Sequence, residues 1–139
     1  MQTFLPYGSD FTAAAKALDY RRLGKQRVES WQIYRALTNQ SKGWRTHPAV
    51  KMWVGCEAAL VQYGLAMCDE WIARGYKDTM RERFVELAQL HSVSGLPKWM
   101  DDPKFVESHR SNLIRKMPEV YSEMWPDTAD DLPYVWPVA

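Results

Sequence analysis

The sequence predicts an all-α fold, a compact single-domain bundle of helices followed by an extended C-terminal segment rich in proline and aromatic residues. Three observations support this prediction. Apolar residues recur with the helical period of about 3.6, capping residues and prolines mark where helices begin, and no useful stretch alternates as a strand would. A length of 139 residues fits one domain, so residues 1–139 are assigned to a single helical domain.

Six helices are expected, and each has a signal at one of its ends: 11–18, 20–37, 48–74, 77–91, 103–116 and 118–125. Ser9 or Asp10 caps the first helix and Asp19 caps the second, because short polar side chains accept hydrogen bonds from the free N–H groups of a first turn. Pro48 suits the first position of the third helix. Gly75 suits the end of that long helix.

The last three helices follow from the same signals. Ser94-Gly95 closes the fourth helix, and Pro97 stands beyond it. Asp102-Pro103 combines a cap with a proline start for the fifth, and Pro118 begins the sixth. Three further prolines follow Trp125. Because proline interrupts helical hydrogen bonding, the C-terminal segment is predicted to be extended.

Several classes of protein are disfavoured by composition. Cys56 and Cys68 lie 12 residues apart within one predicted helix, which separates them by about 18 Å, too far for a disulfide. No histidine lies near them to complete a zinc site. No apolar run is long enough to span a membrane, and the first residues lack the pattern of a signal peptide. We therefore expect a cytoplasmic protein with no metal, no organic cofactor and no membrane partner.

Charge is segregated along the chain although the net charge is only +1. Residues 16–51 carry nine Lys or Arg and two acids, and residues 109–116 carry three Lys or Arg and no acid. Residues 117–139 carry five acids and no Lys or Arg. A basic region in a nearly neutral chain indicates a face for an anionic partner, most commonly nucleic acid. The alternative is a solvated helix face that happens to be basic.

Three charged residues stand out on helical wheels. Arg27 and Glu57 fall on the apolar faces of their helices, where an unpaired charge is costly. They therefore form either an ion pair between the helices or part of a site in a cleft. Glu29 is an acid in the body of the basic helix. It either makes a surface ion pair of little energetic value, or it moves a proton or stabilises a cationic sugar intermediate.

Three parts of the chain resemble one family. They are residues 20–27 (YRRLGKQR), the block from Pro48 to Asp78 that ends in RGYKD, and the pattern of His109, Leu113, Lys116, Pro118 and Tyr121. Their order and spacing resemble the pyrimidine-dimer DNA glycosylases, the phage endonuclease V family, and most closely its bacterial and phage branch. The resemblance covers most of the chain. It implies a helical DNA repair enzyme that flips a nucleotide out of damaged double-stranded DNA.

The resemblance also implies how the reaction begins. The family attacks the deoxyribose C1′ with the α-amine of its N-terminal residue, and an imine forms that leads to strand cleavage. An α-amine has a pKa of about 7.7–8.0, against about 10.4 for lysine, so it is substantially unprotonated at neutral pH. Removal of the initiator Met normally requires a small second residue. Because Gln2 is bulky, the nucleophile here is expected to be the α-amine of Met1.

The catalytic carboxylate is less directly implied. One alignment places the family's acid position at Arg22, and another places it at Val28, with Glu29 beside it. Glu29 is the candidate on that helix, and Glu57 on the facing helix is the alternative. Arg22 and Arg27 are expected to shape the site.

The sequence thus predicts a DNA glycosylase with abasic-site lyase, or endonuclease, activity on damaged or modified pyrimidines. One alternative is a non-catalytic DNA-binding module on the same scaffold, and another is a helical domain whose basic face binds an acidic protein. The expected DNA-binding residues are Arg21, Lys25, Arg45, His47, Lys51, His109, Arg110, Arg115 and Lys116.

Overall fold

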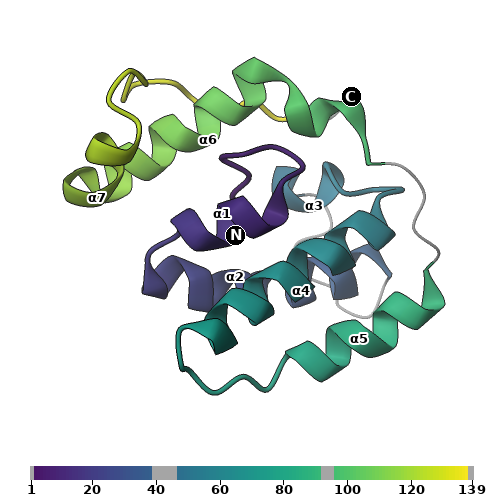
Figure 1. Ribbon diagram of the computed structural model, residues 1–139. Helices are drawn as coiled ribbons and strands as arrows, with labels where there is room; N and C mark the ends of the chain where they lie inside the picture. Colours follow the sequence, from purple (N-terminus) through teal and green to yellow (C-terminus); the bar gives the residue numbers. More distant parts are fainter. Residues whose placement is uncertain (1, 39–46, 92–95, 138–139) are drawn as a thin grey trace.

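The computed structural model describes residues 2–38, 47–91 and 96–137, and over these residues it confirms the all-α prediction (Figure 1). The described residues form helices and no strand. The elements are α1 (Phe11–Ala17), α2 (Tyr20–Leu37), α3 (Pro48–Lys51), α4 (Glu57–Ala73), α5 (Arg81–Leu90), the 3-10 helix η1 (Lys98–Asp101), α6 (Pro103–Lys116) and α7 (Pro118–Met124).

The predicted caps are confirmed where aspartate precedes a helix. Asp10 accepts a hydrogen bond from the Ala13 N–H in α1, and Asp19 accepts one from the Arg22 N–H in α2. Asp102 does the same for α6. Each bond satisfies an N–H group that the first turn of a helix leaves without a partner. These three caps place the helix starts where the sequence put them.

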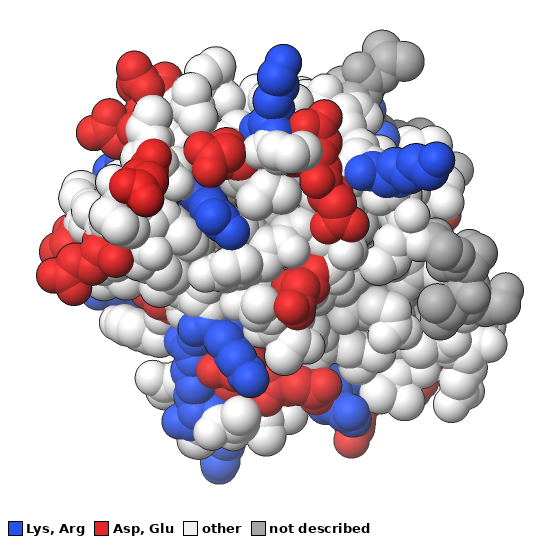
Figure 2. Space-filling model, turned by 45° about the horizontal axis from the view of Figure 1, so that its top comes forward, with Lys and Arg blue, Asp and Glu red and all other residues white. Residues whose placement is uncertain are grey.

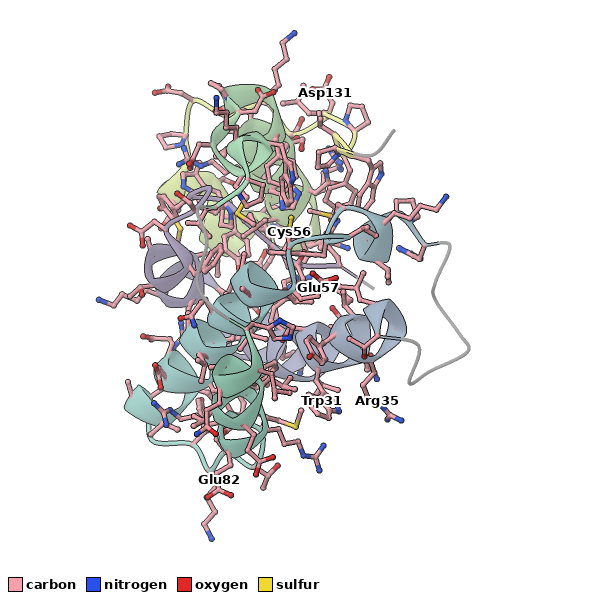
Figure 3. The ribbon with its side chains drawn as sticks, turned by 90° about the vertical axis from the view of Figure 1, so that its right-hand side faces the viewer. Trp31, Arg35, Cys56, Glu57, Glu82 and Asp131 are labelled. Atoms are coloured by element: carbon pink, nitrogen blue, oxygen red, sulfur yellow. The ribbon has the colours of Figure 1, made fainter. Side chains whose placement is uncertain are left out.

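The predicted long helix from Pro48 to Arg74 is wrong, because the chain forms two helices there. α3 ends at Lys51, and α4 begins at Glu57. Gly55 lies between them with a φ of 79°, a left-handed conformation that glycine adopts without steric cost. Cys56 and Glu57 lie at this break (Figure 3). Val54, which the helical wheel placed on the apolar stripe, is exposed as a result.

The core joins helices from both halves of the chain. α4 packs against α2, α5 and α1. Figure 1 shows α6 and α7 on the opposite side of the N-terminal segment from α2, α4 and α5. The largest fully buried side chains come from several of these elements: Trp53, Tyr63, Phe84, Phe105 and Tyr121. Gly64 allows α4 and α5 to approach closely, since a Cβ there would lie 2.4 Å from Phe84.

The first residues of the chain lie buried between the two groups of helices. The Phe4 N–H donates to Gln26 Oε1 at 3.1 Å on α2 and to the Tyr63 hydroxyl at 2.9 Å on α4. On the other side, the Leu5 N–H donates to Nδ1 of His109 at 2.9 Å on α6. The backbone of this segment is therefore satisfied by side chains of three helices, as buried N–H groups require.

The C-terminal segment after α7 forms no helix over its described residues, as predicted, and runs along α6. The Leu132 N–H donates to Ser111 Oγ at 3.0 Å, and the Val135 N–H donates to Ser108 Oγ at 3.2 Å. Arg115 donates to the carbonyls of Asp130 and Leu132 at 2.6 and 2.7 Å. The guanidinium of Arg115 thus holds this segment on α6, while the residue remains exposed.

Arg27 pairs with Asp78 and not with Glu57. The helices that carry Arg27 and Glu57 do pack together, but Arg27 points toward the far end of α4. There its guanidinium lies 4.4 Å from the Trp71 ring centroid and bonds Asp78 in the turn before α5. Glu57 lies instead near Tyr34, where burial and the charge of Glu57 raise the pKa of the tyrosine hydroxyl.

We expect Arg27→Leu to lower the free energy of unfolding by about 3–5 kcal/mol, because it leaves the carboxylate of Asp78 buried without its cation. The Arg27 and Asp78 side chains are only 13% and 2% exposed. Urea denaturation followed by circular dichroism measures the loss. Arg81→Ala removes the exposed partner of Asp69 and should change stability little. An Arg27→Leu protein as stable as wild type would contradict the expectation.

Candidate functional site

A cleft of about 780 Å³ opens between α2, the N-terminal segment and the junction of α6 and α7. α2 contributes half of the lining residues, because residues three and four apart project from one face of a helix. The lining residues are Gln2, Phe4, Asp19, Tyr20, Arg21, Arg22, Lys25, Gln26, Glu29, Lys116, Met117 and Glu119. The cleft thus combines side chains from the beginning, the first third and the last quarter of the sequence.

Glu29 lies where α2 meets the start of the chain. Its Oε2 atom accepts a hydrogen bond from the backbone N–H of Gln2 at 3.3 Å. It accepts a second from Nε2 of Gln26 at 3.1 Å. Glu29 is therefore not the surface partner of Arg22 or Lys25 that the sequence left open, since its described hydrogen bonds go to the N-terminal segment and Gln26.

Gln26 is a site residue that sequence reasoning missed. It is 1% exposed, and its carboxamide bonds the backbone of both Gln2 and Phe4. In the sequence it stands between Lys25 and Arg27 in a basic run. The signal that could have identified Gln26 is its place on the helical wheel, where it lies on the same face as Arg22 and Glu29.

Four cations line the cleft, and we call them the cleft cations: Arg21, Arg22, Lys25 and Lys116. Arg22 is held in place by Asp19, whose Oδ1 atom lies 3.1 Å from Nη1. The Tyr121 hydroxyl on α7 donates to the same oxygen at 2.5 Å. Burial raises the pKa of Asp19, but the hydrogen bonds from Tyr121 and Arg22 outweigh it, so the pKa lies below its ordinary value. Arg22 therefore faces the cleft beside an ionised carboxylate.

The charges around the cleft are mixed. Figure 2 shows acidic side chains gathered on the left, the side on which Figure 1 places α7, and basic side chains below them. Glu119 of α7 lines the cleft together with Lys116. Three of the four cleft cations lie on α2, and the acids of the lining are Asp19 and Glu29 on the same side and Glu119 on α7.

His109 is fully buried, which corrects its expected role as a phosphate contact. Its Nδ1 accepts the hydrogen bond from the Leu5 N–H, so in the neutral ring the proton is on Nε2. Nε2 has no hydrogen-bond partner among the described residues, and aromatic rings of Phe4, Phe105 and Tyr134 surround it. Burial lowers the pKa of His109 to about 3. The neutral His109 ring thus holds the N-terminal segment through its hydrogen bond to Leu5.

The other predicted DNA-binding residues have varied positions. Arg110 donates from Nε to the Pro6 carbonyl at 2.7 Å and lies over the Tyr7 ring, so its described contacts are within the fold. His47 caps α3 by accepting the Ala49 N–H at 3.0 Å. Lys51 is exposed at the end of the same helix. Met1 and Arg45 lie outside the described residues.

Neither a cluster of metal-ligating side chains nor a membrane-spanning helix is present among the described residues. No group of three or more His, Cys, Asp or Glu side chains is arranged to hold a metal ion. None of the described helices combines the length and the apolar character that crossing a membrane demands.

Comparison with known proteins adds one match. The sequence model of a family described as pyrimidine dimer DNA glycosylase matches residues 1–83, more than half of the chain. The match includes Gln2, Gln26, Glu29 and the three cleft cations of α2, whereas Lys116 lies beyond it. The chain matches no curated protein and no solved structure.

We expect the neutral, buried state of His109 to make stability depend on pH. The unfolded chain binds a proton on this ring below about pH 6.5, whereas the folded ring does so only near pH 3. Between these values the unfolded state holds more protons, so stability falls by about 1.4 kcal/mol for each unit that the pH drops. Urea denaturation at pH 6.5 and pH 5 measures this slope.

The matched variant is His109→Gln, which offers an acceptor to the Leu5 N–H but does not titrate. It should lose stability less steeply than wild type between the same two pH values. Equal slopes for the two proteins would show that His109 does not carry the dependence.

Proposed function

Since the chain belongs to the pyrimidine dimer DNA glycosylase family, we propose that it removes a damaged or modified pyrimidine from double-stranded DNA and then cleaves the abasic strand as a lyase. The proposed nucleophile is the α-amine of Met1, and the proposed carboxylate is that of Glu29. Base removal of this kind requires a flipped nucleotide, because the sugar carbon is shielded in a stacked duplex. The cleft of about 780 Å³ is the proposed receptor for it.

The hydrogen bond between the Gln2 N–H and Glu29 carries the proposal. It joins the second residue of the chain to the carboxylate at 3.3 Å. Only two bonded carbon atoms separate the α-amine nitrogen from the nitrogen of Gln2, so covalent geometry keeps the two nitrogens within about 4 Å of each other. The carboxylate of Glu29 is thus bonded to the residue next to the proposed nucleophile, in a cleft lined by cations, and this geometry supports the pairing of amine and carboxylate.

The proposed chemistry begins with attack of the neutral α-amine on C1′. The N–C1′ bond forms as the glycosidic bond breaks, and the electron pair of that bond leaves with the base. The amine then loses a proton and the base gains one, a transfer that a neighbouring carboxylate can mediate. Opening of the sugar ring breaks the C1′–O4′ bond, protonates O4′ and leaves an iminium at C1′.

Strand cleavage follows from the iminium. Loss of a proton from C2′ supplies electrons that the iminium accepts, and the C3′–O bond breaks with departure of the 3′ phosphate. Glu29 is proposed to serve as an ionised carboxylate that stabilises the cationic intermediates. The amine acts as the nucleophile, and the iminium that it forms with C1′ accepts the electrons released in strand cleavage, as in other imine-forming enzymes.

The cleft cations are the proposed contacts to the phosphates that flank the flipped nucleotide. Lys116 brings the second half of the chain into the site, so residues 1–139 are proposed to act as one domain. His47, Lys51 and Arg45 are proposed to extend the contact beyond the cleft.

We expect acetylation of the N-terminus to abolish both borohydride trapping on abasic DNA and strand cleavage, because an amide nitrogen cannot form an imine. Trapping on a duplex with one abasic site, followed by gel electrophoresis, measures the adduct. Trapping that survives acetylation would direct the search to a lysine, and no trapping by the unmodified protein would favour a non-catalytic DNA-binding module.

Glu29→Gln is the companion variant. It should still bind duplex DNA, since it adds no negative charge, but excision of the base should fall by about 10²–10⁴-fold, the range for loss of a positioned acid–base group. Trapping on DNA that is already abasic should be affected less. Full excision activity in this variant would exclude Glu29 as the carboxylate.

We expect the double substitution Arg22→Ala and Lys25→Ala to weaken duplex binding and to flatten its dependence on salt. Each lost phosphate contact should remove about 0.9 from the slope of log affinity against log salt, measured by fluorescence anisotropy. The matched control is Lys98→Ala with Lys104→Ala, two exposed lysines at the other end of α6 from Lys116. An unchanged slope in the first variant would remove these residues from the interface.

A further inference from the structure

We propose that Gln26 is a positioning residue of this reaction, because its carboxamide holds the N-terminal segment and the Glu29 carboxylate in one fixed relation. The inference rests on the proposed function, since it requires the α-amine as nucleophile and Glu29 as carboxylate. Gln26 lines the floor of the cleft but is only 1% exposed, so it presents almost no surface to DNA and acts through the groups that it holds.

The hydrogen bonds of Gln26 occupy both ends of its carboxamide. Oε1 accepts from the Phe4 N–H at 3.1 Å, and it lies 2.5 Å from the Tyr63 hydroxyl, whose single proton is shared between Oε1 and the Phe4 carbonyl. Nε2 donates to the Gln2 carbonyl at 2.9 Å and to Glu29 Oε2 at 3.1 Å. The amide oxygen has two lone pairs and the amide nitrogen two protons, so every hydrogen-bonding position of this side chain is used.

These contacts allow one orientation of the carboxamide. The Phe4 N–H is a donor that cannot reverse its role, so it must face the oxygen of Gln26. The Gln2 carbonyl is an acceptor that cannot reverse its role either, so it must face the amide nitrogen of Gln26. The Gln26 amide nitrogen is therefore directed at Glu29. Two N–H donors, from Gln2 and Gln26, then meet one oxygen of Glu29, an arrangement that suits an ionised carboxylate.

Gln26 also fixes the direction in which the chain leaves toward its N-terminus. It accepts from the N–H of residue 4 and donates to the carbonyl of residue 2, which are the two backbone groups that a neighbouring strand would bond. The backbone of Thr3 between them is thereby restrained. Since the α-amine belongs to the residue before Gln2, restraint of Gln2 restricts the positions that the amine can take relative to Glu29. A displacement of about 1 Å in such a group can cost about 10²-fold in rate.

The test compares Gln26→Met with Ser30→Ala. Ser30 is fully buried one turn further along α2, and its hydroxyl donates to the Gln26 carbonyl at 2.6 Å, so its loss controls for a disturbed helix interior. Gln26→Met should slow single-turnover excision on a duplex with one cyclobutane thymine dimer, and trapping on abasic duplex, by about 10²-fold. Its affinity for duplex and the salt slope should match wild type. Ser30→Ala should change none of these rates.

A second variant, Gln26→Asn, keeps a neutral carboxamide but shortens the side chain by one methylene, so it cannot reach both the Phe4 N–H and Glu29. It adds no charge and should show the same separation of rate from affinity, which keeps the inference testable if Gln26→Met does not fold. A double-mutant cycle gives a further readout. Combined with Glu29→Gln, the Gln26→Asn loss of excision should be less than the product of the single losses, because both substitutions act on one unit.

The outcomes separate the two proposals. Wild-type trapping together with undiminished excision and trapping in both Gln26 variants would overturn the role of Gln26 alone. Parallel losses of rate, affinity and thermal stability, shared by Ser30→Ala, would assign Gln26 a structural role and also overturn it. Failure of the wild-type protein to trap abasic DNA would overturn the proposed function and this inference with it.

Discussion

The structure depends on burial of the first few residues of the chain between two groups of helices. Buried backbone N–H groups need partners, and no strand is present among the described residues to supply them. Side chains supply them instead: Gln26 and Tyr63 on one side of the segment, and His109 on the other. Each of these polar groups would be costly to bury alone. The segment and its supports therefore stabilise one another, and the cleft forms above them.

A second set of contacts holds the helices that present the cleft. The Arg27 guanidinium lies against Trp71, which stacks on Tyr76 at a centroid separation of 4.3 Å. Gly24 lets α2 approach this indole, since a Cβ there would already lie 3.1 Å from it. The face of α2 opposite the cleft is thus fixed against the end of α4. Because side chains project from a helix at fixed angles, packing one face of α2 against α4 also fixes the direction in which its cleft-lining side chains point.

Local signals predicted much of the fold, whereas partners distant in sequence escaped prediction. The cap at Asp19 was predictable because its bond lies within one turn. The break at Gly55 was not, since a single glycine inside an apolar run is compatible with a helix at modest cost. The wheel identified Arg27 as a buried charge, but its partner Asp78 lies in the turn before α5, which begins at Arg81, although the sequence assigned residues 77–91 to a helix. Glu29 was predicted from its isolation among cations, while Gln26 gave no signal because glutamine is usually exposed.

The hydrogen bond between Leu5 and His109 spans 104 positions of the chain. Synthesis proceeds from the N-terminus at about 5–20 residues per second, so the residues that emerge first must wait for one of their last partners. The helices of the first half can pair earlier, because α2 and α4 contact each other directly. The N-terminal segment cannot be enclosed until α6 has been made. The cleft is therefore completed late in synthesis. A ribosome-bound fragment that ends before α6 lacks part of the site.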